Sequence, residues 1–246
     1  MRSIALVLAT ALVFAGAGAA NATVKTVVLV HGAFADGSGW RPVAKILEHD
    51  GYKVQIVQEP ETTYEDDVKA TNLVLDKSGP CVLVGHSYGG MIITGAGDHA
   101  NVKALVYIAA FVPDVGESAG ALQTKTPPAA KSIGPVGGGY LAVDQAAFPK
   151  DFAADVSASV SHFMAISQVP VSIEALSANA TVAAWKDKPS YAVVATRDHM
   201  INPDLERFMY KRAKSHTIEL TGSHAIFLSH PKEVAALIEK AAKAAK

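Results

Sequence analysis

Gly85-His86-Ser87-Tyr88-Gly89 is the stretch of sequence that decides the fold. It has the pattern G-x-S-x-G, in which a serine sits on a tight turn between a strand and a helix. The run before it, Cys81–Val84, is short and apolar, as expected for a strand buried on both faces. The residues after it are small and predict a helix packed closely on the sheet. Glycine is needed on both sides of Ser87 because such a turn is crowded and strained. The stretch therefore predicts a nucleophilic serine at a strand-to-helix turn.

A second apolar run, Val27–Val30, leads into a loop that begins His31-Gly32-Ala33. A serine that carries out acyl transfer needs backbone N–H groups that face the developing oxyanion. In this architecture one donor belongs to the residue after the serine, and the other to the loop after an early strand. We therefore expect the oxyanion hole to be formed by Tyr88 and Ala33, with Phe34 as the alternative to Ala33.

The same glycine-rich loop has the G-x-x-x-x-G spacing of a phosphate-binding loop over residues 32–37. Ser38 stands where that motif requires lysine, and the chain has no G-x-G-x-x-G motif beside it. Nucleotide binding is therefore not expected.

Residues 1–22 resemble a secretory signal. Arg2 is followed by the apolar run Ile4–Phe14 and by the cleavage-like stretch Ala20-Asn21-Ala22. The run is too short for a transmembrane span, and an uncleaved anchor is the alternative. We expect a periplasmic or secreted mature protein, residues 23–246, folded as one α/β domain.

Composition excludes several partners and cofactors. The chain carries 22 basic and 23 acidic residues, which gives no sign of binding to nucleic acid or to a membrane surface. Cys81 is the only cysteine, so no intrachain disulfide is possible. No pair of residues has metal-ligand spacing such as H-x-x-x-H or C-x-x-C, and we expect no metal or cofactor. The oligomeric state is not indicated.

Apolar strands alternate with helical segments along the mature chain. Strands are predicted at 24–30, 53–57, 81–86, 103–109, 190–196 and 215–220. Helices are predicted near 39–50, 64–77, 88–98, 203–214 and 231–245. This alternation predicts an α/β fold with a mostly parallel central sheet and helices on both faces.

Residues 112–187 interrupt that alternation and are too long for a plain loop. Short helix-like pieces at 155–168 and 172–178 predict a helical cap over the strand ends. Phe34, Phe163, Met164 and Trp185 are candidates to line a substrate pocket, although the aromatic residues could equally pack between cap and core.

A nucleophilic serine needs a histidine base and an acid that orients it, in the chain order Ser, Asp, His. His224 follows the last strand, at the sheet edge where ligands bind in open α/β sheets. Asp198 follows the strand 190–196 and is the preferred acid. Asp114, after the strand 103–109, is the alternative, whereas Asp204 is assigned to the start of a helix. His199 is given no catalytic role.

Five separate blocks together resemble the α/β-hydrolases. They are Val28–Ala33, Gly85–Gly90, Phe111–Ser118, Thr196–Asp198 followed by Ile201–Pro203, and Gly222–His224. The resemblance is strongest to the branch that holds plant methyl-ester esterases, hydroxynitrile lyases and their bacterial relatives. It implies Ser87 as nucleophile, His224 as base, Asp198 as acid, and Ala33 and Tyr88 as oxyanion donors. The lyases carry threonine and lysine where this chain has Gly32 and Ala225, which favours hydrolysis.

The sequence thus predicts a serine hydrolase of small to medium, uncharged carboxylic esters that works through an acyl-enzyme. The insertion at 112–187 lacks a cluster of basic residues that could pair with a charged acyl group. A lactonase or a cofactor-free perhydrolase would use the same three residues. A non-catalytic ligand-binding protein on the same fold is the alternative from another class.

Overall fold

Six parallel strands form the central sheet, in the order β2-β1-β3-β4-β8-β9. The computed structural model describes residues 23–245, so the expected signal lies outside the described residues. The strands are β1 (Thr26–Val30), β2 (Lys53–Val57), β3 (Cys81–Ser87), β4 (Val102–Ala110), β8 (Ser190–Ala195) and β9 (His216–Leu220). The predicted strands are therefore all present, with closely similar bounds.

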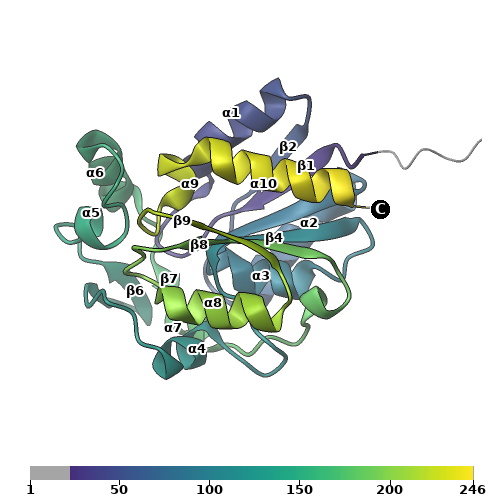
Figure 1. Cartoon of the computed structure of the whole chain (residues 1–246). Coiled ribbons are helices and arrows are strands. Elements are labelled where there is room, and N and C mark those ends of the chain that lie inside the picture. The colour runs from purple at the N-terminus through teal and green to yellow at the C-terminus, as the bar shows by residue number, and fades with distance from the viewer. Residues whose placement is uncertain (1–22, 246) are drawn as a thin grey trace, which may run out of the picture.

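Helices cover both faces of this sheet (Figure 1). One face carries η1 (Gly37–Trp40), α1 (Arg41–His49), α9 (Ile226–Ser229) and α10 (Pro231–Ala244). The other carries α2 (Tyr64–Ser78), α3 (Gly89–Ala96) and α8 (Pro203–Arg212). Alternate strand residues feed the two cores: Val27 and Leu29 pack toward α1 and α10, whereas Val28 and Val30 pack toward α2 and α3. The α/β prediction is confirmed.

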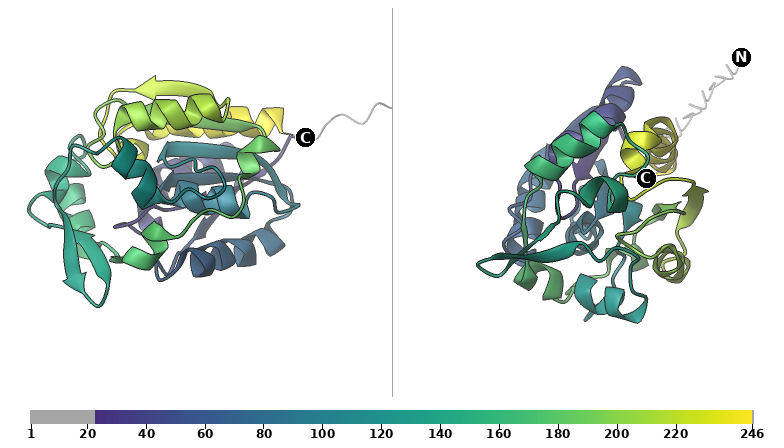
Figure 2. Two further views of the ribbon diagram at one scale, coloured as in Figure 1. Left: turned by 90° about the horizontal axis from the view of Figure 1, so that it is seen from below. Right: turned by 90° about the vertical axis from the view of Figure 1, so that its left-hand side faces the viewer.

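The insertion, residues 112–187, lies between β4 and β8 and mixes helices with strands. Its elements are α4 (Ala119–Lys125), β5 (Ile133–Gly137), β6 (Tyr140–Val143), α5 (Phe148–Asp151), α6 (Ala158–Ser167), β7 (Val171–Ser172), α7 (Ile173–Ser177) and η2 (Ala184–Lys186). Strands β5, β6 and β7 form an antiparallel sheet that the sequence did not predict. Figures 1 and 2 show α5, α6 and this small sheet gathered at one end of the molecule.

The hairpin between β5 and β6 explains why this sheet was missed. Gly137, Gly138 and Gly139 form its turn with φ angles of 98°, 61° and 82°, a left-handed conformation that favours glycine. Pro135 and Gly134 lie inside β5 itself, and both residue types are depleted in strands. The composition therefore predicts a loop, and only pairing with β6 makes the segment a strand.

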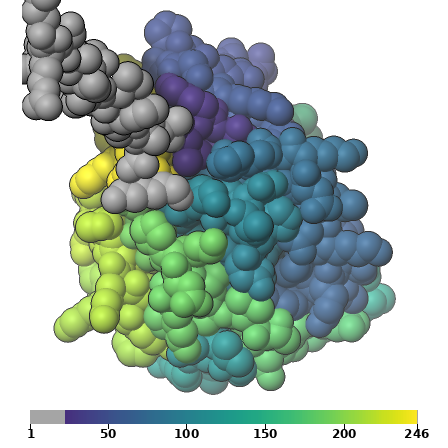
Figure 3. Space-filling model, turned by 90° about the vertical axis from the view of Figure 1, so that its right-hand side faces the viewer, coloured from purple at the N-terminus to yellow at the C-terminus, as the bar shows by residue number. Residues whose placement is uncertain are grey.

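At the opposite end of the molecule the described chain begins beside the end of α10. The N–H of Val24 donates to the carbonyl of Ala242 at 3.3 Å. Figure 3 shows this face, with the purple start of the described chain near the yellow C-terminal helix. Among the described residues, no helix has both the length and the apolar character that a membrane crossing requires.

Candidate active site

Ser87 lies at the point where β3 gives way to α3. Its φ angle is 52°, in the left-handed region that residues other than glycine rarely adopt. The turn is so tight that a Cβ added at Gly85 would lie 2.5 Å from the carbonyl oxygen of Gly89. A Cβ added at Gly89 would lie 2.3 Å from the carbonyl oxygen of His31. Strain of this kind persists only where the surroundings enforce it, and here it holds Ser87 at the carboxyl end of the sheet.

His224 and Asp198 come together in two loops at this same end. The Nδ1 atom of His224 lies 2.5 Å from Oδ2 of Asp198, and both side chains are buried. The other oxygen of Asp198 accepts hydrogen bonds from the N–H groups of Met200 (2.6 Å) and Ile201 (2.9 Å). The carboxylate is therefore fixed at both oxygens. Because Nδ1 donates to it, the lone pair of His224 is on Nε2, where a base needs it.

His86, the residue before Ser87 on β3, contacts the loop that carries His224. His86 Nε2 donates to the carbonyl of His224 at 3.0 Å, and the two rings lie 4.5 Å apart. Burial and the nearby His224 hold the pKa of His86 well below its usual range, so this ring is neutral. The contact places the Ser87 backbone next to the His224 loop.

The insertion supports His224 from the other side. The ring of Phe152 stands perpendicular to the His224 ring at 4.8 Å, and its carbonyl accepts from the N–H of Ala225 at 3.0 Å. Asp155 accepts hydrogen bonds from both the N–H (3.1 Å) and the hydroxyl of Ser223. The sequence did not predict that these two residues support His224, because nothing local marks contacts that a distant loop makes.

The two expected oxyanion donors lie beside Ser87. Ala33 and Tyr88 both line the cavity that the serine faces. The loop after β1 passes so close that a Cβ added at Gly32 would lie 2.6 Å from the Cβ of Ser87. Phe34, the alternative donor, has a φ angle of 63°. The hydroxyl of Tyr88 points away from the cavity and donates to Oδ2 of Asp67 at 3.0 Å.

A group of buried titratable side chains, which we call the acid cluster, lies behind this loop. It consists of His31, Glu59, Glu61 and Asp67. His31 Nδ1 lies 3.8 Å from Glu59 Oε2 and 3.6 Å from Glu61 Oε1, while Asp67 Oδ1 accepts from the N–H of Glu61 at 2.8 Å. Burial, followed by the charge of Asp67, raises the pKa of Glu59 and of Glu61 well above the usual range. Burial also raises the pKa of Asp67 to about 6.

Three members of the acid cluster, His31, Glu59 and Glu61, are close enough together to be considered as ligands of a metal ion. The ligand atoms of His31, Glu59 and Glu61 lie within 4.8 Å of one another. However, the N–H of Glu59 donates to His31 Nε2 at 3.0 Å, so the neutral ring carries its proton on Nδ1. A protonated Nδ1 has no lone pair for a metal ion. The burial that raises the pKa of Glu59 and of Glu61 instead favours their neutral, protonated forms.

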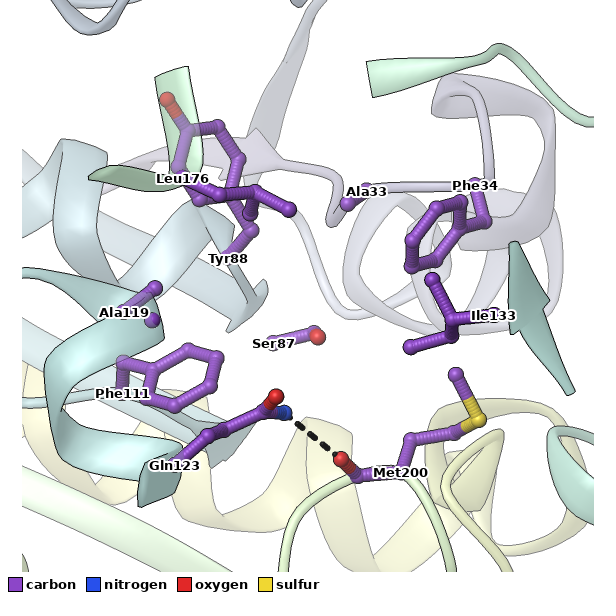
Figure 4. Close-up of a pocket in the computed structure, with 11 residues that line it drawn as sticks. Ala33, Phe34, Ser87, Tyr88, Phe111, Ala119, Gln123, Ile133, Leu176 and Met200 are labelled. Atoms are coloured by element: carbon purple, nitrogen blue, oxygen red, sulfur yellow. Dashed lines mark hydrogen bonds between the residues drawn. The ribbon is translucent and has the colours of Figure 1, made fainter. Parts of the chain in front are cut away.

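The cavity beside Ser87 has a volume of about 50 Å³ (Figure 4). Its walls come from the core and from α4, β5 and α7 of the insertion. The lining residues are Ala33, Phe34, Ser87, Tyr88, Phe111, Ala119, Gly120, Gln123, Ile133, Leu176 and Met200. Most of this lining is apolar.

The structure places three of the four expected pocket residues elsewhere, and only Phe34 lines this cavity. Helix α6 buries Ser161 and Ala165, so Phe163, on the opposite face, is 59% exposed. Phe163 and Met164 line a separate surface cavity. Trp185 donates from Nε1 to the carbonyl of Pro113 at 2.7 Å, a bond that ties the end of the insertion to its start, and its ring packs against the core.

The alternative residues are paired away from His224. Asp114 accepts from Lys186 at 2.5 Å, and Asp204 pairs with Arg207 at 2.8 Å in the first turn of α8. His199 lies 3.8 Å from Asp151. Asp198 is the candidate acid that the structure brings to His224.

Comparison with known proteins identifies the family of the chain. Residues 27–237 match the family described as the alpha/beta hydrolase family. A carbendazim hydrolyzing esterase from Nocardioides sp. (strain SG-4G) is 34% identical over 130 residues, which are 47% of this chain and 54% of that protein. The chain thus matches about half the length of this relative.

Solved structures with the same fold include the following two. A pyrethroid hydrolase from Sphingobium faniae JZ-2 superposes with a TM-score of 0.79 at 23% identity, covering 90% of this chain and 98% of that one. The methylesterase protein MES16 from Arabidopsis gives 0.73 at 17% identity, covering 89% and 98%. The plant esterase branch that the sequence resembles is thus among the structural neighbours. With its family match, its parallel sheet and its serine at the strand-to-helix turn, the chain belongs to the alpha/beta hydrolase family.

Proposed function

We propose that the protein is a serine hydrolase of small, uncharged carboxylic esters, with Ser87 as nucleophile, His224 as base and Asp198 as the acid that orients the base. The observation that carries this proposal is the buried His224–Asp198 pair at 2.5 Å, in a loop tied to the residue next to Ser87. The matched relative from Nocardioides is named an esterase, which agrees with the reaction class.

In the proposed reaction, Ser87 Oγ attacks the ester carbonyl while His224 Nε2 takes its proton. The N–H groups of Ala33 and Tyr88 stabilise the oxyanion of the tetrahedral intermediate. When that intermediate collapses, His224 gives the proton to the leaving alcohol and an acyl-enzyme remains. Water, activated by the same histidine, then attacks the acyl-enzyme and releases the acid, which regenerates Ser87.

The cavity supports a short, uncharged substrate. Its volume of about 50 Å³ is far below the roughly 300–1,000 Å³ of ordinary ligand pockets, so the part of the substrate held beside Ser87 must be small. The lining offers no cation to an anionic acyl group, whose hydration would be lost on entry. Rates for esters of one alcohol should fall as the acyl chain lengthens.

The replacement Ser87→Ala tests the proposal. We expect it to abolish labelling by a fluorophosphonate probe and to lower kcat for an activated short-chain ester by about 10⁴- to 10⁶-fold, because the nucleophile is removed. Ser38, an exposed serine in η1, provides the control: Ser38→Ala should keep both the labelling and the turnover. Near-normal turnover by the Ser87→Ala protein would refute the assignment.

A further inference from the structure

The cavity beside Ser87 contains few polar side-chain groups. Its lining includes the hydroxyls of Ser87 and Tyr88 and the amide of Gln123, and every other side chain there is apolar. The Tyr88 hydroxyl is engaged by Asp67 at 3.0 Å and does not face the cavity. The Gln123 amide is therefore the polar side chain of this lining that the proposed reaction does not use.

The orientation of that amide follows from its partner. Gln123 Nε2 donates to the backbone carbonyl of Met200 at 2.8 Å. A carbonyl oxygen only accepts, so the nitrogen must be the end of the amide that faces Met200. Oε1 then faces the other way, and Figure 4 shows it on the side of the amide nearer to Ser87. Within residues 23–245 no hydrogen bond to Gln123 Oε1 is formed.

The helix that carries Gln123 is firmly anchored. Ser118 caps α4 by accepting a hydrogen bond from the N–H of Ala121 at 3.2 Å. The neighbouring Leu122 is fully buried. With one end of the amide bonded to Met200 and the helix fixed at its start, Oε1 is held in place before a substrate binds. Such an acceptor pays little entropy when it forms a hydrogen bond.

We infer that Gln123 is a specificity-determining residue that selects esters carrying an O–H or N–H donor near the reacting carbonyl. This inference rests on the proposed function and narrows its substrate class. A plain ester would displace water from Oε1 and leave that acceptor unpaired in an apolar cavity, which is unfavourable. An ester with a suitably placed donor would replace the lost hydrogen bond, and it would be held in one orientation.

The test uses methyl esters in matched pairs that differ by a hydroxyl or a methyl group at the same carbon. Methyl 2-hydroxypropanoate is paired with methyl 2-methylpropanoate, and methyl 3-hydroxybutanoate with methyl 3-methylbutanoate. In each pair the ratio of kcat/KM values reports the preference for a donor. We expect the wild type to favour the hydroxy ester of at least one pair by about tenfold, the effect of one neutral hydrogen bond.

Gln123→Met, which keeps the side-chain length but removes the acceptor, should bring that ratio to 1 or below. Gln168→Met is the matched control, since the Gln168 amide is bonded at both ends to Val143 (2.8 and 2.9 Å) and lies outside this cavity. It should keep the wild-type ratio. Because each ratio is internal to one protein, a partial loss of folded material does not alter it.

A wild-type ratio at or below 1 in both pairs, or a preference that survives in the Gln123→Met protein, would overturn the inference. The proposed function is judged separately, by whether the wild type hydrolyses either member of a pair and whether Ser87→Ala abolishes that hydrolysis. A wild type that cleaves the methyl-bearing esters as well as the hydroxy esters would thus keep the hydrolase and discard the role of Gln123.

Discussion

Asp198 accepts three hydrogen bonds, one from the His224 ring and two from the backbone N–H groups of Met200 and Ile201. All three donors require an oxygen at the position that they meet. An amide in place of the carboxylate presents an NH₂ group to one of them, and the tautomer of His224 is then no longer fixed.

Asp198→Asn is therefore expected to lower kcat by about 10⁴-fold. Asp114→Asn is the matched control, since Asp114 meets Lys186 rather than His224, and its activity should stay close to that of the wild type. Steady-state kinetics on a short-chain ester measure both. A larger loss in the Asp114 variant would move the acid to the loop after β4.

At this scale the sequence identified residues with distinctive chain positions. Ser87 lies in a motif, and Asp198 and His224 each follow a predicted strand, so their meeting at one sheet edge was predictable; their catalytic roles stay a prediction. Gln123 and Asp155 were not found, because they act through contacts with loops far away in the chain. Phe163 was misplaced because its sequence shows an aromatic residue but not which helix face turns inward.

Among the elements, helix α3 packs directly against the backbone that follows β4. A Cβ added at Gly90 would lie 2.2 Å from the backbone oxygen of Phe111, an atom that cannot move without shifting the chain after β4. Gly134, in β5, has open space around the position of a Cβ and no left-handed backbone. The two glycines thus differ in what a methyl group would meet.

Gly90→Ala should lower the free energy of unfolding by about 2 kcal/mol or more, as expected for overpacking against backbone. Gly134→Ala should change it by under about 0.5 kcal/mol. Chemical denaturation followed by circular dichroism gives both values. Equal stability of the two variants would show that α3 can move away from the sheet.

The elements of the core were predictable because each strand is a continuous apolar run between turn signals. Val82, Val84 and their neighbours are buried on both faces of a parallel sheet, and such burial leaves a plain mark in the sequence. Strand β5 carries no such mark, since it contains Pro135 and much of it is exposed. Its pairing with β6 depends on the turn of three glycines, and from sequence alone such a run predicts a loop as readily as a hairpin turn.

Over the whole molecule, the acid cluster makes stability depend on pH in an unusual direction. Glu59, Glu61 and Asp67 have pKa values raised by burial, so between the ordinary carboxyl pKa and the raised values the folded state binds more protons than the unfolded state. Unfolding then releases protons, and the free energy of unfolding falls as pH rises through this window. Buried His31 and His86, whose pKa values are lowered, act oppositely at acid pH.

A variant with both Glu59→Gln and Glu61→Gln isolates this effect. The melting temperature of the variant relative to the wild type should increase between pH 5 and pH 8, by about 3 °C or more, because the amides have no charge to bury. Calorimetric scans at fixed ionic strength across that range measure the difference. A difference that stays constant with pH would show that the two carboxyls titrate normally.

The contacts that Phe152 and Asp155 make with the His224 loop bear on how any substrate enters. A lid that swung away with this part of the insertion would take the aromatic ring off the imidazole and break both bonds to Ser223. The molecule would then be open, but His224, the proposed base, would have lost these contacts. An opening made by the walls that carry Ile133 and Leu176 would instead leave the stretch from Phe152 to Asp155 docked on the His224 loop.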